Sequence, residues 1–470
     1  MKQLRAIVIQ TMRSAVRSRV FHVLFLFILL AVALLPLVVS GDGTARAQAQ
    51  ITLTYSLGVV VALISTTTLW LGCSQLPREV EDYTIHMVTT KPCPRWIIWV
   101  GKWLGVFIMN AAILVVSFLI ILSLVHFGLS RKRFDEQQMV RLREEVLVGR
   151  RGFEPDRPNY MQDAREEYAR KKDAGELEEG HDPDTTLGSI LQHMKTRTTG
   201  LEAGHTKTWR FQNVNVPKGT ENLYLRYRHY LDSTSQSAQK VTLGFWEIHN
   251  PNAKGNQAAT RIEQRVLTGN YHEVKIPASH ISEDGVLEVG YFNPLPEVAK
   301  EGKTGEDRGH SVIFQWADGP LVLARVSGFT TNYARAMVLA LLQVAFLSAL
   351  GCAVGAAFST PVAAFVAIAY LVIGLSVQAA VSAPLQDDFG RYTYKGVADR
   401  AAHYLARTVG KVVVSVDDFD ATSDLARGRL VEYSRVAWTT LNLIVIRGGL
   451  IALFGVWVLT RRELGTVIRR

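Results

Sequence analysis

One segment of the chain gathers charged residues of both signs between two long apolar runs. It extends from Pro77 to Arg95 and carries the carboxylates of Glu79, Glu81 and Asp82. An ionised group inside hydrocarbon costs several kcal/mol, so this segment must be a short excursion into water between two membrane spans. Its charged side chains are therefore expected to face water and to be accessible to a partner.

Apolar residues within the same segment indicate its local structure. Ile85, Met87 and Val88 form a short stripe beside the carboxylates, and Pro92 and Pro94 follow. This pattern predicts a helix of about two or three turns at the membrane surface, which the prolines end. A simple polar loop is the alternative that the residues alone leave open.

The motifs of common enzymes are missing from the sequence. It contains no G-x-x-x-x-G-K-[ST] loop for ATP phosphates, and no G-x-S-x-G, H-E-x-x-H or kinase motif. The twelve histidines are scattered, and the run from His181 to Asp184 lacks the glycine and final glutamate of a calcium loop. We therefore expect no catalytic residue, no metal site and no cofactor bound by this chain itself.

Six apolar runs are long enough to cross a bilayer, which takes about 20 residues. They lie near 21–40, 51–73, 96–127, 336–358, 361–383 and 437–460. The polar block between the third and fourth runs is large enough to bury a core of its own. The sequence thus predicts a polytopic α-helical membrane protein with six transmembrane helices and one soluble insert.

Basic residues predict the orientation of the spans. They cluster before the first span, around the second connection and after the last span, at Lys2, Arg5, Arg13, Arg17, Arg19, Arg78, Lys91, Arg95, Lys102, Arg461, Arg462, Arg469 and Arg470. The positive-inside rule assigns all three clusters to the cytoplasm. We expect a cytoplasmic (inner) membrane protein surrounded by lipid, with both termini cytoplasmic and the insert 131–329 extracytoplasmic. The net charge of +10 then reflects topology, and no nucleic acid partner is expected.

The first twenty residues read as an amphipathic helix that lies in the membrane interface. A signal peptide is the alternative, since Ala45-Arg46-Ala47 is similar to a cleavage site. The apolar run at 21–40 is longer than the 7–15 residues typical of a signal peptide. An uncleaved first span is therefore favoured.

The insert has two parts of different character. Residues 131–204 are charged and favour helices. Residues 205–329 alternate between apolar and polar positions, with turn residues between the runs, which predicts an antiparallel β-sandwich. The expected strands are 208–213, 222–231, 240–249, 261–267, 272–277, 286–293 and 312–316. The insert is thus an extracytoplasmic α+β domain, and the spacing of its strands resembles jelly-roll modules that bind carbohydrate, at the level of fold only.

Many aromatic residues fall in this predicted sandwich, and most are expected in its core, because large rings fill the space between two sheets. They are Trp209, Phe211, Tyr224, Tyr227, Tyr230, Trp246, Tyr271, Tyr291, Phe292 and Trp316. Binding of a glycan or of another envelope component by some of them is left open.

Polar residues inside the predicted spans are candidates for a translocation path. They are Thr66, Thr67, Gln378 and Arg447. Hydroxyl groups in spans commonly bond to the preceding turn or join neighbouring helices, and this is the favoured interpretation of the threonines. An arginine within a span is a functional hypothesis by default. The favoured alternative pairs Arg447 with a carboxylate of the external section 384–436.

The connection between the second and third spans is similar to that of type-2 ABC transporter permeases, including those linked to multicopper-enzyme maturation. The resemblance is carried by Glu79, Thr84, Ile85, Val88, Lys91-Pro92, Arg95 and Gly101-Lys102. It implies that 77–91 is a coupling helix which docks on a separate ATP-binding subunit. The implied docking residues are Glu79, Glu81, Asp82, Thr84, Ile85, Val88, Lys91 and Arg95.

The same resemblance implies the rest of the assembly. Residues 1–20 would form an elbow helix, and a second copy of the chain or a relative would complete the permease. ATP and Mg²⁺ would be bound by the partner subunit. The transported substrate is not readable from the sequence. The competing hypothesis is a membrane-anchored envelope scaffold or glycan-binding protein that acts through its sandwich.

Overall fold

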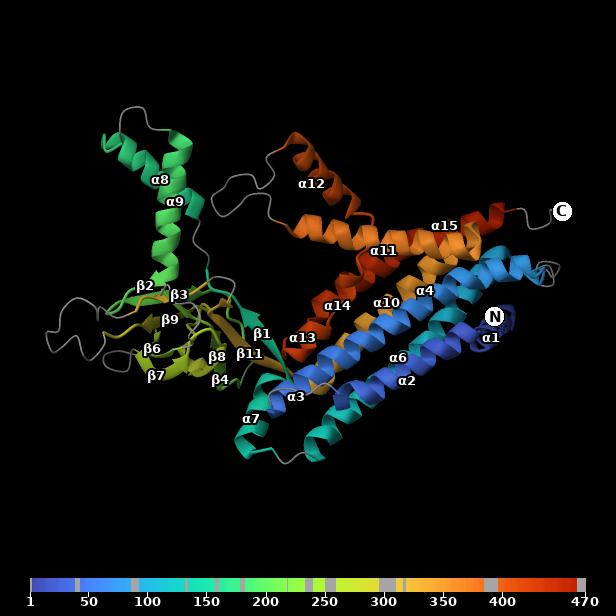
Figure 1. The fold of residues 1–470 in the computed structure, drawn as a ribbon, viewed down its shortest axis with the longest axis horizontal. Coiled ribbons are helices and arrows are strands. Elements are labelled where there is room, and N and C mark those ends of the chain that lie inside the picture. Colours follow the sequence, from blue (N-terminus) through green and yellow to red (C-terminus); the bar gives the residue numbers. More distant parts are fainter. Residues whose placement is uncertain are drawn as a thin grey trace. The chain divides into compact units, whose positions relative to one another are not determined.

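The computed structural model describes residues 2–38, 43–85, 93–131, 134–156, 160–177, 182–217, 219–232, 240–249, 259–295, 310–315, 318–383 and 396–462 (Figure 1). The chain divides into two compact units. The helical unit contains Met1–Gly149, Ser327–Pro384 and Tyr394–Arg470, and the β-rich unit contains Arg150–Val326 with Leu385–Thr393. The boundaries between the insert and the helical unit therefore lie near Gly149 and Ser327.

The helical unit is built from long apolar helices and a few short elements. Its helices are α1 (Lys2–Val16), α2 (Arg19–Val38), α3 (Ala45–Ile51), η1 (Thr52–Ser56), α4 (Leu57–Glu81), α6 (Arg95–Arg131), α7 (Glu136–Glu145), α10 (Phe329–Ala357), α11 (Thr360–Ser382), α12 (Val397–Val409), η6 (Val416–Phe419), α13 (Thr422–Ala426), α14 (Tyr433–Thr439), η7 (Thr440–Gly448) and α15 (Gly449–Arg461). In the described part, α4 packs along α10 and α6 (Figure 1).

Five stretches of helix are long and apolar enough to cross a membrane in the described part of the chain. They are Ala45–Glu81, Arg95–Phe127, Phe329–Ala357, Thr360–Ser382 and Tyr433–Arg461. A sixth results if Lys2–Val16 and Phe21–Ala31, which meet at a bend of 70°, count as one span. Five of the six predicted spans thus coincide with helices of the required length, and the six-span topology stays a prediction.

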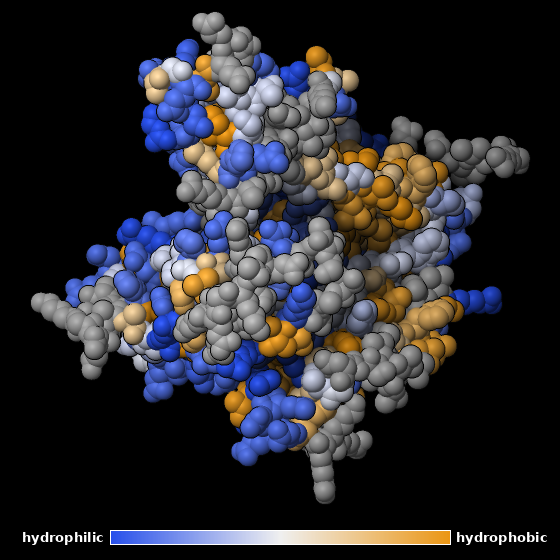
Figure 2. Space-filling model, turned by 60° about the vertical axis from the view of Figure 1, so that its left-hand side comes forward, coloured by the Kyte–Doolittle hydropathy of each residue, from blue (hydrophilic) through white to orange (hydrophobic). Residues whose placement is uncertain are grey.

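The surface of these helices is rich in exposed apolar side chains. Phe365 is 72 % exposed, Leu453 68 % and Phe127 64 %. Figure 2 shows apolar residues gathered into broad patches beside strongly hydrophilic surface. Patches of this kind are rare on monomers in water. They suit helices that lie in a bilayer, where the backbone is satisfied internally and apolar side chains meet lipid.

Glycines let α4 and α10 approach closely. A Cβ atom at Gly351 would lie 3.0 Å from the Cα atom of Gly72 and 3.0 Å from the carbonyl oxygen of Leu69. At Gly355 it would lie 3.0 Å from the oxygen of Cys73. Small residues at such a crossing allow backbone-to-backbone packing.

Substitution of Gly351 by leucine is expected to destabilise the helical unit by about 1–3 kcal/mol, because the added side chain meets backbone that cannot move aside. Denaturant unfolding of the purified full chain measures this. Gly58→Leu is the matched control, since nothing lies within 4 Å of a Cβ atom built at Gly58 on α4. Equal stability of the two variants would contradict the close packing.

The β-rich unit contains antiparallel sheets and two helices. Its elements are β1 (Val148–Phe153), α8 (Tyr160–Asp173), α9 (Pro183–Thr199), β2 (Gly200–Leu201), β3 (Thr206–Phe211), β4 (Asn222–Tyr227), β5 (Tyr230–Leu231), β6 (Val241–His249), β7 (Ala259–Leu267), β8 (His272–Pro277), η3 (Ala278–His280), β9 (Leu287–Phe292), β10 (Val312–Ile313) and β11 (Leu321–Gly328). Two sheets have the strand orders β1-β11-β4-β8 and β3-β9-β6-β7, and a small third sheet is β2-β10-β5.

These strands agree with the predicted segments, with three additions: β1, the two-residue β2, which also falls in the part expected to be helical, and β11. β1 lies in the part expected to be helical, and β11 follows the last predicted strand; the two are neighbours in one sheet. The residues of both large sheets share one core, which is consistent with the predicted β-sandwich. Of the aromatic residues expected there, five are buried: Trp209, Phe211, Tyr227, Trp246 and Tyr291. Tyr271 is 40 % exposed, and Trp316 lies outside the described residues.

A buried histidine makes the stability of this core depend on pH. His229 is fully buried and its Nε2 shares a hydrogen bond of 2.7 Å with the hydroxyl of Thr242. Burial, and then the nearby His272, lowers the pKa of His229 from 6.5 to about 4. The folded state therefore holds this imidazole neutral at a pH where the unfolded chain protonates it.

We expect the free energy of unfolding of the β-rich unit to fall by about 3 kcal/mol as the pH falls from 6.5 to 4. The reason is that His229 takes up a proton in the unfolded chain at a higher pH than in the folded one. Above pH 6.5 the contribution is constant. Urea unfolding of the full chain at a series of pH values tests this. His229→Gln should flatten the dependence, whereas His205→Gln, at an exposed histidine, should retain it. An identical pH profile in both variants would contradict the assignment.

Candidate partner-docking site

The acidic segment begins as a continuation of α4 rather than as a separate helix. α4 is unbroken from Leu57 to Glu81 and includes Pro77. A proline inside a helix removes one backbone hydrogen bond, here to the carbonyl of Cys73, and commonly breaks it. Pro77 is buried, and Gly355 of α10 lies against that same carbonyl. We attribute the continuity of the helix to this packing.

α4 ends just beyond the acidic residues. Tyr83 follows with φ of 58°, a left-handed conformation that stops an α-helix. Residues 86–92 lie outside the described part of the chain, and with them the predicted docking residues Val88 and Lys91. The acidic end of α4 is therefore a rigid extension of a candidate membrane span.

Glu79 forms an ion pair with Lys102 of α6. Both side chains are withdrawn from water, with 12 % of Glu79 and 2 % of Lys102 exposed. Desolvating two charges is costly, and only a well-formed pair offsets that cost. The ion pair ties the end of α4 to α6 and keeps the Glu79 side chain largely away from the surface.

Gly101, the neighbour of Lys102, has a separate packing role. A Cβ atom there would lie 2.6 Å from the Cγ2 atom of Ile7 on α1. At Gly105, one turn later, it would lie 2.6 Å from the Cβ atom of Thr11. Gly101 thus allows α1 to pack closely on α6, beside the lysine that pairs with Glu79 of α4. Gly101 and Lys102 therefore both make contacts within the chain.

Arg95 also contacts this chain rather than projecting away from it. Its Nη1 donates to the carbonyl oxygens of Leu459, Thr460 and Arg462 at 3.1, 2.8 and 2.9 Å. These carbonyls belong to the end of α15, where they lack partners within the helix and carry partial negative charge. Arg95 therefore caps α15 and joins it to the start of α6.

The exposed remainder of the segment is small and acidic. Glu81 and Asp82 are exposed, as is Tyr83 at 60 %; we name these three residues the acidic tip. Thr84 donates from its hydroxyl to the carbonyl of Glu79 at 3.4 Å, and Ile85 is buried. Among the predicted docking residues that the structure describes, Glu81 and Asp82 are the exposed ones.

The four candidate path residues are not brought together by hydrogen bonds in the described part. Thr66 and Thr67 donate to the carbonyls of Ala62 and Leu63 at 2.9 and 2.7 Å, as favoured from the sequence. Gln378 is exposed on α11. These contacts satisfy the threonine hydroxyls within their own helix, and a role in a translocation path stays a prediction.

Arg447 bonds to the main chain rather than to a carboxylate. Its Nη1 donates to the carbonyl of Val413 at 3.1 Å, and Asp418 is near enough to interact with it electrostatically. The amide of Val414 donates to the hydroxyl of Tyr370 at 3.0 Å. Val414 and Phe419 are buried among residues of α10 and α11.

This part of the section predicted to be external therefore enters the helical unit. Irregular backbone at membrane depth persists only where protein satisfies its polar groups, and Arg447 and Tyr370 do so here. Sequence reasoning missed Tyr370 and Val413. The only indication in the sequence was the charge of Arg447, which requires a polar group close to it.

Comparison of the chain with protein-family models, curated proteins and solved structures found no match. The site is therefore interpreted from its own geometry. Among the described residues, no group of three or more His, Cys, Asp and Glu side chains is placed to hold a metal ion. The acidic tip has charge and exposure suited to protein recognition.

Proposed function

We propose that the chain is the permease subunit of an ABC-type exporter in the cytoplasmic membrane. A separate subunit would bind ATP and Mg²⁺ and dock on the acidic tip. The permease would contain two copies of this chain or one copy and a relative. The proposal combines the resemblance of the second connection to type-2 ABC permeases with the geometry of α4.

The observation that carries the proposal is the mechanical continuity of α4. The exposed carboxylates of the tip lie at the last residue and at the C-cap of the same helix that packs along α10 at Gly72 and Gly351. The ion pair of Glu79 with Lys102 prevents the end of α4 from bending independently of α6. A force applied to the tip would consequently move two candidate spans together, as conformational coupling to a nucleotide-binding subunit requires.

Purification of the full chain from its native membrane in mild detergent tests this function. Photolabelling with azido-ATP should mark a second, co-purifying protein and leave this chain unlabelled, because the sequence has no phosphate-binding loop. The preparation should hydrolyse ATP. Absence of any nucleotide-binding protein from preparations that retain the native oligomer would refute the proposal.

A second function, glycan binding, is favoured by a cluster on the β-rich unit. Tyr230 and Tyr271 donate from their hydroxyls to the two oxygens of Asp318 at 2.5 and 2.8 Å. Arg226 lies 4.4 Å from the centre of the Tyr271 ring, and Arg228 lies 5.0 Å from that of Tyr230. Burial acts to raise the pKa of Asp318, but the two hydroxyls and Arg228 outweigh it and lower the pKa. Oriented rings beside fixed charges are features of ligand sites.

The full chain in detergent would be screened on a glycan array for this second function. Tyr271→Ala should reduce any saturable binding at least about tenfold, because contacts of an aromatic ring dominate such sites. Tyr404→Ala, an exposed tyrosine of the helical unit, serves as the control. Equal binding by both variants would exclude the cluster as a glycan site.

A further inference from the structure

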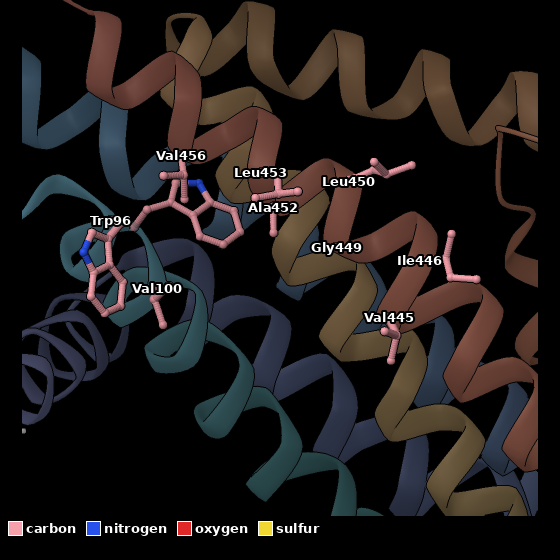
Figure 3. A pocket seen from close by; sticks show the side chains of 10 residues that line it. Trp96, Val100, Val445, Ile446, Gly449, Leu450, Ala452, Leu453 and Val456 are labelled. Carbon is pink, nitrogen blue, oxygen red and sulfur yellow. The ribbon is translucent and has the colours of Figure 1, made fainter.

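An apolar groove runs along α15 beside the start of α6 (Figure 3). Its volume is about 630 Å³. Every lining residue is apolar or a tryptophan: Trp96, Trp99, Val100, Val445, Ile446, Gly449, Leu450, Ala452, Leu453 and Val456. Figure 3 shows Trp96 and Val456 near one end and Val445 and Ile446 at the other. The eleven helical steps from Val445 to Val456 cover about 16 Å, so the groove is long and narrow.

Small residues keep the groove open at its middle. A Cβ atom built at Gly449 would meet nothing within 4 Å, and Ala452 follows on the same face. A larger residue at Gly449 would occupy the groove without displacing the backbone of a neighbouring helix. The hollow therefore depends on side-chain size at these two positions.

The Trp96 end of the groove is polar and basic. Trp96 is 54 % exposed and follows Arg95, which caps α15. Arg461 is exposed at the last residue of α15. It lies eleven residues after Leu450, which is about three turns, so it continues the groove-lining face of the helix. Tryptophan and arginine together are typical of the boundary between hydrocarbon and headgroups.

We propose that this groove binds an acyl chain of an anionic phospholipid, whose phosphate contacts Arg461. Apolar lining suits the chain, and a guanidinium group suits the phosphate, which it binds through paired hydrogen bonds. The inference requires that the helical unit lies in a bilayer, but it does not require coupling to an ATPase.

A second copy of the chain fits the groove less well than a lipid. Copies related by an axis along the membrane normal would bring two Arg461 residues to the same depth, where like charges repel. Among the residues that line the groove, only the indole N–H groups of Trp96 and Trp99 can form hydrogen bonds, so few groups fix the register of a protein partner. An anionic lipid supplies a negative charge that can pair with Arg461.

Native mass spectrometry of the full chain, exposed to equal amounts of palmitoyl-oleoyl phosphatidylglycerol and phosphatidylcholine, tests the proposal. Wild type should retain phosphatidylglycerol in preference. Gly449→Leu should reduce the retained lipid about tenfold by filling the groove, and Gly58→Leu, at an equally open glycine of α4, should not. Arg461→Gln should reduce the preference for phosphatidylglycerol about fivefold, and Arg461→Lys should largely preserve it.

A photoactivatable phosphatidylglycerol, with its reactive group on the acyl chain, gives a test on the wild-type protein that needs no variant to fold. Labelled peptides should include residues 445–456. Labelling confined to other segments, or equal retention of the two lipids by wild type, would overturn the proposal. Loss of the oligomer in Gly449→Leu without any change in lipid retention would assign the groove to a second copy instead.

Discussion

Replacement of Lys102 by methionine is expected to destabilise the helical unit by about 3–5 kcal/mol. The methionine would leave the carboxylate of Glu79 buried without its cation, and an uncompensated buried charge costs more than the intact pair contributes. Only 2 % of the Lys102 side chain is exposed, so water cannot take over the role of the ammonium group. This is the largest single-residue effect that we expect in the helical unit.

Thermal and denaturant unfolding of purified variants measure this effect. The double variant Glu79→Gln/Lys102→Met should recover much of the loss, because it removes both charges, and the two substitutions should be strongly non-additive. Lys411→Met makes the same change at an exposed lysine and should be nearly neutral. A cost for Lys102→Met no greater than that for Lys411→Met would show that the pair does not hold α4 in place.

Reversal of both charges of the tip, in the variant Glu81→Lys/Asp82→Lys, is expected to weaken association with the proposed ATP-binding subunit at least about tenfold. Charges at an interface set partner choice, and juxtaposed like charges cost several kcal/mol. Stability should change little, since both side chains are exposed and exposed charges contribute little to folding. Quantitative co-purification in detergent, with ATPase activity as a second readout, measures the change.

A matched reversal elsewhere separates a local effect from one of net charge. Asp399→Lys/Asp417→Lys alters the charge by the same amount at two exposed residues between α11 and α14. It should leave association intact. If the two double variants lose association equally, the tip is not the docking surface.

The helices and strands could be predicted from the sequence because each follows from local periodicity. A run such as 336–358 is apolar throughout, and one such as 272–277 alternates with period two, so each predicts its element without knowledge of any neighbour. β1 and β11 were missed because β1 lies in a stretch of high charge, and its pairing with β11 joins residues far apart in the chain.

The roles of the site residues could not be predicted because they depend on long-range partners. Glu79 is paired with a lysine on another helix, and Arg95 contacts carbonyls more than 360 residues away. The spacing of these residues in the sequence does not show which of them are exposed. In the structure, some residues of this segment hold the end of α4 in place, as Glu79 does, and others are exposed, as Glu81 is.

We expect the end of the helical unit that carries the acidic tip to face the cytoplasm. Cys93 adjoins this end and is partly exposed, whereas Cys73 and Cys352 are buried, so the wild-type chain carries its own probe. We predict that a membrane-impermeant maleimide leaves the chain unlabelled in intact cells and labels Cys93 once the membrane is opened. An added cysteine at the exposed Ser279 of the β-rich unit should show the reverse order and react in intact cells. Labelling of Cys93 in intact cells would contradict the account.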